Sequence, residues 1–170
     1  MRDHQRMLIL CYDGSADAKA AIDRAGALLK SSPALVLAVW EPFIDVIARA
    51  GLGMAYGAPS WDGDEVDAAS ERNATALAEE GAARARELGL DAQPRATARD
   101  GSIAGAILDV ADELDAEAIV LGSRGLTGVK SLLLGSVSHA VLQHADRPVI
   151  VVPSPEVIEA RAQHRRDRRP

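Results

Sequence analysis

Short apolar runs alternate with longer stretches of helical spacing along almost the whole chain. The run Leu35–Trp40 is apolar at consecutive positions, which is typical of a strand buried on both faces of a parallel sheet. Strands that alternate with helices predict a parallel sheet covered by helices on both faces. We therefore expect one doubly wound α/β domain with a five-stranded parallel sheet, its strands being Met7–Tyr12, Leu35–Trp40, Gln93–Ala98, Ala118–Leu121 and Pro148–Val152.

Helix boundaries are indicated by serine and glycine residues between these runs. Ser15, Ser102 and Ser136 each precede a helical stretch and are predicted to cap it, because serine is a favoured N-cap residue. Gly89 follows the helical stretch from about residue 65 to residue 88 and suits the position just beyond a helix. Residues 41–63 are rich in Gly and Pro and are expected to form a long loop.

The net charge and the chain length limit the classes of protein to which this chain can belong. A chain of 170 residues fits one domain, taken here as residues 1–155, followed by a basic tail at 156–170 that is expected to be disordered. The net charge of −6 argues against nucleic-acid binding, which needs clustered cations. The first apolar run is too short for a signal or membrane segment, and Cys11 is the only cysteine. A cytoplasmic protein without membrane attachment is expected.

Two loops that follow strands could carry chemistry. The first is Asp13-Gly14-Ser15, where a carboxylate just beyond a strand can accept hydrogen bonds from ribose hydroxyls. The second, residues 122–138, leaves a buried strand and enters a helix, so its glycines and the helix N-terminus can approach an anion. Arg124 and Lys130 could neutralise phosphate there. If the two preceding strands are neighbours, both loops open into the same crevice.

The spacing within the second loop is more specific than its composition. Gly122 and Gly125 are separated by two residues, and nine further residues precede Gly135 and Ser136. This arrangement resembles the signature of the universal stress protein family, which is Gly, two residues, Gly, nine residues, Gly, then Ser or Thr. The resemblance extends to residues 12–15 and 147–152 and spans about residues 6–153.

The resemblance implies an adenine nucleotide α-hydrolase-like fold and, through the ATP-binding branch of the family, a site for ATP, with Mg²⁺ arriving on the triphosphate. It implies that Asp13 contacts ribose or adenine and that Val39 lines the adenine pocket. No protein metal site and no catalytic residue is expected. The remaining expected binding residues belong to the glycine-rich loop: Leu121, Gly122, Arg124, Gly125, Gly135, Ser136, Val137 and Ser138.

Three functions remain open. The first is a nucleotide-binding stress-response regulator, and the second is a weak ATP-hydrolysing enzyme of the related α-hydrolase group. Such enzymes carry a Ser-Gly-Gly-x-Asp-Ser type loop after strand one, where this chain has residues 11–15 with a different pattern. The third is a nucleotide-free signalling or scaffold dimer. The apolar strand Val149–Val152 is expected at the sheet edge, and the resemblance points to a homodimer through it.

Overall fold

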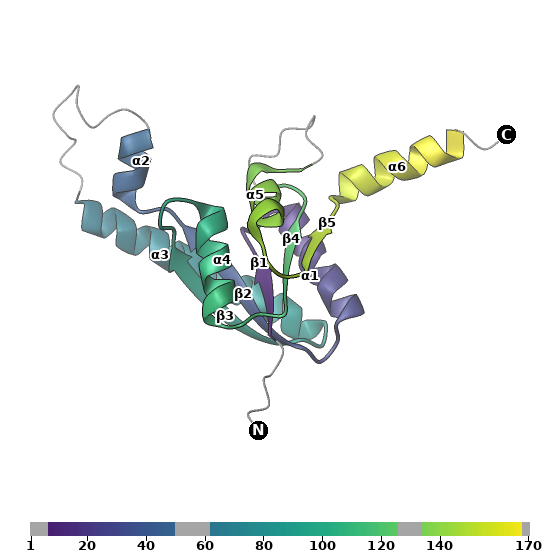
Figure 1. Cartoon of the computed structure of the whole chain (residues 1–170), viewed down its shortest axis with the longest axis horizontal. Coiled ribbons are helices and arrows are strands. Elements are labelled where there is room, and N and C mark those ends of the chain that lie inside the picture. Colours follow the sequence, from purple (N-terminus) through teal and green to yellow (C-terminus); the bar gives the residue numbers. More distant parts are fainter. Residues whose placement is uncertain (1–6, 50–61, 126–133, 168–170) are drawn as a thin grey trace.

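Five parallel strands form one sheet at the centre of the computed structural model, which describes residues 7–49, 62–125 and 134–167 (Figure 1). The order across the sheet is β3-β2-β1-β4-β5. The predicted α/β fold with a five-stranded parallel sheet is therefore confirmed. The strands are β1 (Leu8–Cys11), β2 (Pro33–Trp40), β3 (Asp91–Ala98), β4 (Ala118–Gly122) and β5 (Val149–Val152).

Helices cover both faces of this sheet. The strands β1, β2, β4 and β5 present apolar side chains in both directions, whereas β3 at the edge has polar residues, among them Gln93 and Arg95, on one face. On β1, Leu8 and Leu10 belong to the buried cluster with α1 (Ala16–Leu28) and α3 (Gly63–Glu87). Ile9, which points the other way, belongs to the cluster with α4 (Ile103–Glu113) and α5 (Ser136–His144). The burial of these four strands on both faces explains why they are apolar at consecutive positions.

Two of the predicted helix caps are present, and the third lies one residue earlier. The hydroxyl of Ser15 accepts from the N–H of Ala18 at 3.1 Å, and Ser102 caps α4 in the same way. The N-cap of α5 is Gly135 and not Ser136, which is the first helical residue. Gly135 has the extended backbone conformation usual for an N-cap, and its N–H donates to the carbonyl of Ser123 at 2.7 Å.

The segment 41–63, expected to be a loop, contains a short helix, α2 (Phe43–Arg49). The N–H at the start of this helix, on Phe43, donates to the Asp67 carboxylate of α3 at 2.6 Å. A side chain from a later helix therefore caps α2, and this contact is not visible in the local sequence. Residues 50–61 lie outside the described residues.

The tail, expected to be disordered, contains a helix, α6 (Pro155–Asp167). Ser154 caps it by accepting from the N–H of Val157 at 3.2 Å, and Pro155 suits the first helical position. Glu156 lies in the first turn, and basic residues occupy the last, as the helix dipole favours. Figure 1 shows α6 projecting from the body of the protein.

The strand order reverses between β1 and β4, which lie side by side at the centre of the sheet. From β1 the chain moves outward to β2 and β3, and it then returns to β4 and β5. In an open parallel sheet, ligands bind at this reversal, beyond the carboxyl ends of the strands. Among the described helices, none is both long and apolar enough to cross a membrane.

Candidate functional site

A cleft of about 450 Å³ opens beyond the carboxyl ends of β1 and β4. Its volume lies within the range of small-molecule pockets, about 300–1,000 Å³. The fold thus brings the Asp13 loop and the glycine-rich loop to one place. All ten residues that the sequence selected line this cleft: Asp13, Val39, Leu121, Gly122, Arg124, Gly125, Gly135, Ser136, Val137 and Ser138.

The apolar wall of the cleft was largely missed by sequence reasoning. Leu37 from β2 joins Val39, and Ile103 and Ile107 come from the first turns of α4. One signal was available, because residues two apart on a strand share a face and Leu37 must accompany Val39. The other lining residues that the sequence did not indicate are Cys11, Tyr12 and Ala18.

Asp13 lies where the two loops meet. Its carboxylate Oδ1 accepts from the N–H of Ser15 at 3.0 Å, which holds the side chain in place at the start of α1. Its other oxygen, Oδ2, faces Gly125 so closely that a Cβ on Gly125 would lie 2.7 Å away. A side chain at position 125 would therefore force either the Asp13 carboxylate or the loop to shift.

The base of the glycine-rich loop is held by backbone and hydroxyl contacts. A Cβ on Gly122 would lie 2.8 Å from the backbone carbon of Asp17, so β4 and α1 touch through this glycine. The hydroxyl of Ser138, a buried residue, donates to the carbonyl of Gly122 at 2.8 Å. Ser138 therefore joins α5 to β4 through its hydroxyl, whereas Ser136 is exposed at the start of α5.

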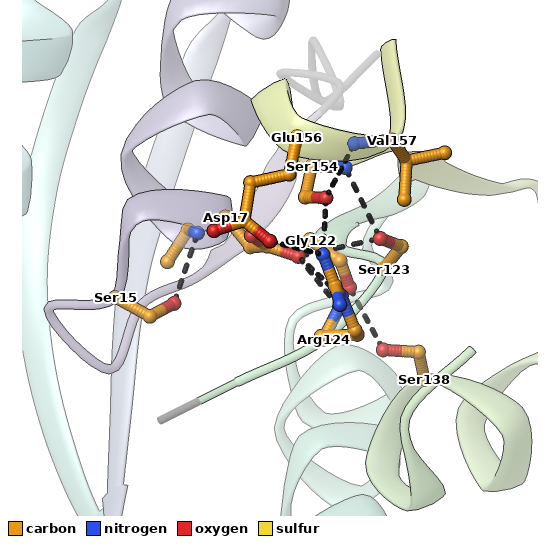
Figure 2. A network of polar contacts seen from close by, with 10 residues as sticks. Ser15, Asp17, Gly122, Ser123, Arg124, Ser138, Ser154, Glu156 and Val157 are labelled. Atoms are coloured by element: carbon orange, nitrogen blue, oxygen red, sulfur yellow. Dashed lines mark hydrogen bonds and ion pairs between the residues drawn. The ribbon is translucent and has the colours of Figure 1, made fainter. Parts of the chain in front are cut away.

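Arg124 lines the cleft, but its guanidinium group is engaged elsewhere. Figure 2 shows it between Asp17 and the start of α6, where it donates to the hydroxyl of Ser154. Its Nε lies 3.7 Å from Asp17 Oδ2, and its Nη2 lies 3.6 Å from Glu156. The sequence suggested Arg124 as a phosphate partner, and the structure instead uses its charge to join α1, the loop and α6.

The first turn of α5 lines the cleft with backbone N–H groups that can bind an anion. Gly135 is the N-cap of this helix, and no side chain among the described residues caps it. The first N–H groups of a helix have no partner within the helix, and they carry partial positive charge. Beside the apolar wall of Leu37, Ile103 and Ile107, these donors suit a ligand with one flat apolar part and one anionic part. Lys130, named as a possible phosphate partner, lies outside the described residues.

Cys11, at the end of β1, is a probe of this cleft because it is the only cysteine of the chain and lines the cavity. Burial raises the pKa of its thiol from 9.0 to about 12, and the nearby negative charge of Asp13 adds to the rise. The sequence suggested a core position, and Cys11 is partly buried against the α4 and α5 side of the core.

We expect Cys11 to react very slowly with a thiol reagent at pH 8. A rise in pKa of this size lowers the thiolate fraction, which is the reactive form, by roughly a thousandfold. The measurement compares the rate at which Ellman's reagent modifies Cys11 in the native chain with the rate in guanidinium chloride. Similar rates in the two states would contradict the burial of this thiol.

Comparison with known proteins identifies relatives of this chain by sequence. The profile of the universal stress protein family matches residues 6–153. The chain is 32% identical over 146 residues to "Universal stress protein YxiE" of Bacillus subtilis, covering 85% of this chain and 97% of that protein. It is 34% identical over 149 residues to a universal stress protein of Thermus aquaticus, with 86% and 98% covered.

Solved structures share the fold. The structure of MJ0577 superposes with a TM-score of 0.69 at 21% identity, covering 88% of this chain and 96% of the other. A universal stress protein in complex with cAMP gives a TM-score of 0.58 at 23% identity, with 88% and 98% covered. A family protein of Arabidopsis thaliana with AMP bound gives 0.53 at 18% identity, with 86% and 90% covered. On its sequence match and its fold, this chain belongs to the universal stress protein family.

Proposed function

We propose that this chain binds ATP or a closely related adenine nucleotide in the cleft between β1 and β4, and acts as a nucleotide-dependent regulator of a stress response. The observation that carries the proposal is the convergence of ten sequence-selected residues on one cleft of suitable volume. Further support comes from relatives whose structures contain cAMP or AMP.

Each part of the cleft has a chemical role in this proposal. The apolar wall of Val39, Leu37 and Ile103 would cover the faces of the adenine ring. Asp13 would accept hydrogen bonds from the ribose hydroxyls. The backbone of Gly125 and the N-terminus of α5, from Gly135 onward, would hold phosphate oxygens. A Mg²⁺ ion bound with the triphosphate would neutralise part of its charge.

The test has two arms. The purified chain is denatured and the supernatant is separated by chromatography, which reveals any nucleotide carried through purification. Nucleotide-free chain is then titrated calorimetrically with ATP, ADP, AMP and cAMP, with GTP as the control for base recognition. Saturable binding of an adenine nucleotide, together with a higher melting temperature, supports the proposal. If none of the four adenine nucleotides binds at millimolar concentration, the proposed function is wrong.

We expect bound ATP to be hydrolysed far more slowly than about 1 per second, which is the lower end of typical enzyme turnover numbers. Hydrolysis needs a group that orients water or takes its proton, and Asp13 is the only acidic residue among those described as lining the cleft. Its carboxylate is held by the N–H of Ser15 and is assigned to the ribose. His139, the other candidate base, is exposed on α5. Steady-state phosphate release at several turnovers per second would favour the ATP-hydrolysing enzyme if Gly125→Val abolishes that release.

The chain is further proposed to form a homodimer through β5. Support comes from the position of β5 at the edge of the sheet, with Val149, Ile150 and Val151 only partly buried. An exposed apolar edge strand can pair with a second copy about a two-fold axis.

We expect Val151→Lys to shift this dimer towards monomer in light scattering at micromolar concentration, because the lysine would place a charge in each copy of the paired edge. The matched control is Gln93→Lys, which adds the same charge to β3 at the opposite edge of the sheet. A monomeric parent chain would contradict the proposal, as would a dimer that Val151→Lys leaves intact.

A further inference from the structure

One polar cluster joins the cleft to the C-terminal helix. Asp17 in the first turn of α1 accepts from the backbone N–H of Arg124 at 3.0 Å and from the hydroxyl of Ser123 at 3.3 Å. The hydroxyl of Ser123 also accepts from the N–H of Ser154 at 3.2 Å. The guanidinium of Arg124 donates to the hydroxyl of Ser154, which in turn caps α6. Figure 2 shows these groups meeting at one point.

The side chains of this cluster are buried, so the stability of the cluster depends on whether its charged groups and hydroxyl groups have partners. Ser123 and Ser154 are 4% and 1% exposed, and the side chains of Arg124 and Asp17 are 8% and 12% exposed. A charged group in such surroundings is costly unless it is paired and hydrogen-bonded. Loss of one partner therefore forces the others to rearrange or to admit water.

The cluster adjoins the cleft through the backbone of the glycine-rich loop. Arg124 lies between Gly122, which packs on Asp17, and Gly125, which faces Asp13. A shift of Arg124 must therefore move the part of the loop that approaches Asp13. Arg124 is thus placed to position the loop, while its guanidinium remains with Asp17 and Ser154.

Helix α6 has few other attachments to the body. Most of its described residues are exposed, and Ile158, 37% exposed, is the one that lines an apolar groove shared with α1 and β5. The Ser154 cap is held by both Arg124 and Ser123, so the position of α6 depends on the loop.

We propose that Arg124 couples the cleft to α6: it positions the glycine-rich loop through Asp17 and Ser154, so that nucleotide binding stabilises α6 and loss of the Ser154 contact weakens nucleotide binding. The proposal rests on the proposed nucleotide site. The two effects are linked, because a coupling between two sites acts equally in both directions. Helix α6 would then be the element through which occupancy of the cleft is transmitted to the surface.

The first experiment measures the dissociation constant of ATP by calorimetry for full-length variants. Ser154→Ala and Arg124→Gln should each weaken binding about fivefold or more. The double variant should lose less affinity than the two single losses combined, because both changes break the contact between Arg124 and Ser154. Ser154→Thr keeps a hydroxyl group and should restore binding. Arg166→Gln, an exposed change on the same helix, is the control and should match the parent.

The second experiment follows hydrogen exchange of the backbone amides in α6. ATP should slow exchange over residues 157–167 in the parent chain and should leave it unchanged in Arg124→Gln at saturating ATP. A parent chain that binds no adenine nucleotide overturns the proposed function and the coupling with it. A parent chain that binds ATP, with an affinity unaltered by Ser154→Ala and with no change of exchange in α6, overturns the coupling alone.

Discussion

A Gly125→Val variant is expected to lose at least about a hundredfold in ATP affinity while its apo form keeps the parent's melting temperature. A Cβ at this position would lie 2.7 Å from Asp13 Oδ2, which is closer than real Cβ atoms approach any heavy atom. The carboxylate can turn aside only by giving up the hydrogen bond that its other oxygen accepts from the N–H of Ser15. Either Asp13 leaves this position or residue 125 moves away from it, and both changes disturb the place where the nucleotide would bind.

The size of this effect follows from the contacts that would be lost. A hydrogen bond to a charged group is worth about 1.5–3 kcal/mol, so two displaced phosphate contacts amount to about a hundredfold in affinity. Gly125 is exposed at the surface of the apo protein, and valine there buries no new group in the core. The fold should therefore survive the change.

The measurement is an ATP titration of parent and variant, with thermal melting of both apo proteins. Ala27→Val is the matched control, because it adds a branched side chain at an exposed position of α1 outside the cleft lining. If Gly125→Val binds ATP like the parent, the glycine-rich loop does not hold the phosphates, and another part of the chain must be the site.

Elements with local signals could be predicted from the sequence. The strands other than β3 are apolar at consecutive positions, and Ser15 and Ser102 precede the helices that they cap. From the sequence, the pairing of β1 with β4 could only be assumed, because strand order depends on contacts across the whole chain. Once that pairing is given, the meeting of the two loops follows from the topology.

Helix α6 had a local signal that was overlooked. The sequence Ser154-Pro155-Glu156 contains a favoured cap, a favoured first residue and an acid in the first turn. The arginines beyond it are compatible with a disordered basic tail, but basic residues in the last turn also stabilise a helix. Composition alone did not distinguish the two interpretations.

The role of Arg124 could not be predicted from the sequence. Its partners Asp17 and Ser154 lie 107 and 30 residues away along the chain. In sequence Asp17 is merely an acid in the first turn of a helix, and an arginine in a glycine-rich loop suggests a phosphate partner. Only the packing of α1 and α6 on either side of the loop gives Arg124 its internal partners.

An Asp17→Ala variant is expected to lose about 3 kcal/mol of unfolding free energy, because removing one partner of a buried ion pair leaves the Arg124 charge with only the exposed Glu156 carboxylate as an ionic partner. Native domains have only about 5–15 kcal/mol in total, so the loss is large. Asp17 also accepts from the backbone N–H of Arg124 and the hydroxyl of Ser123, and both would lose their acceptor. The measurement is urea unfolding followed by circular dichroism.

Asp23→Ala is the matched control on the same helix. Asp23 pairs with Arg84 at 2.7 Å, but their side chains are 44% and 41% exposed, so this pair should contribute at most about 1 kcal/mol. Arg124→Met in the Asp17→Ala background should recover part of the stability, because it removes the charge that has lost its buried partner. If Asp17→Ala costs no more than Asp23→Ala, water compensates the Arg124 charge, and the cluster at the base of the glycine-rich loop adds little to the stability of the fold.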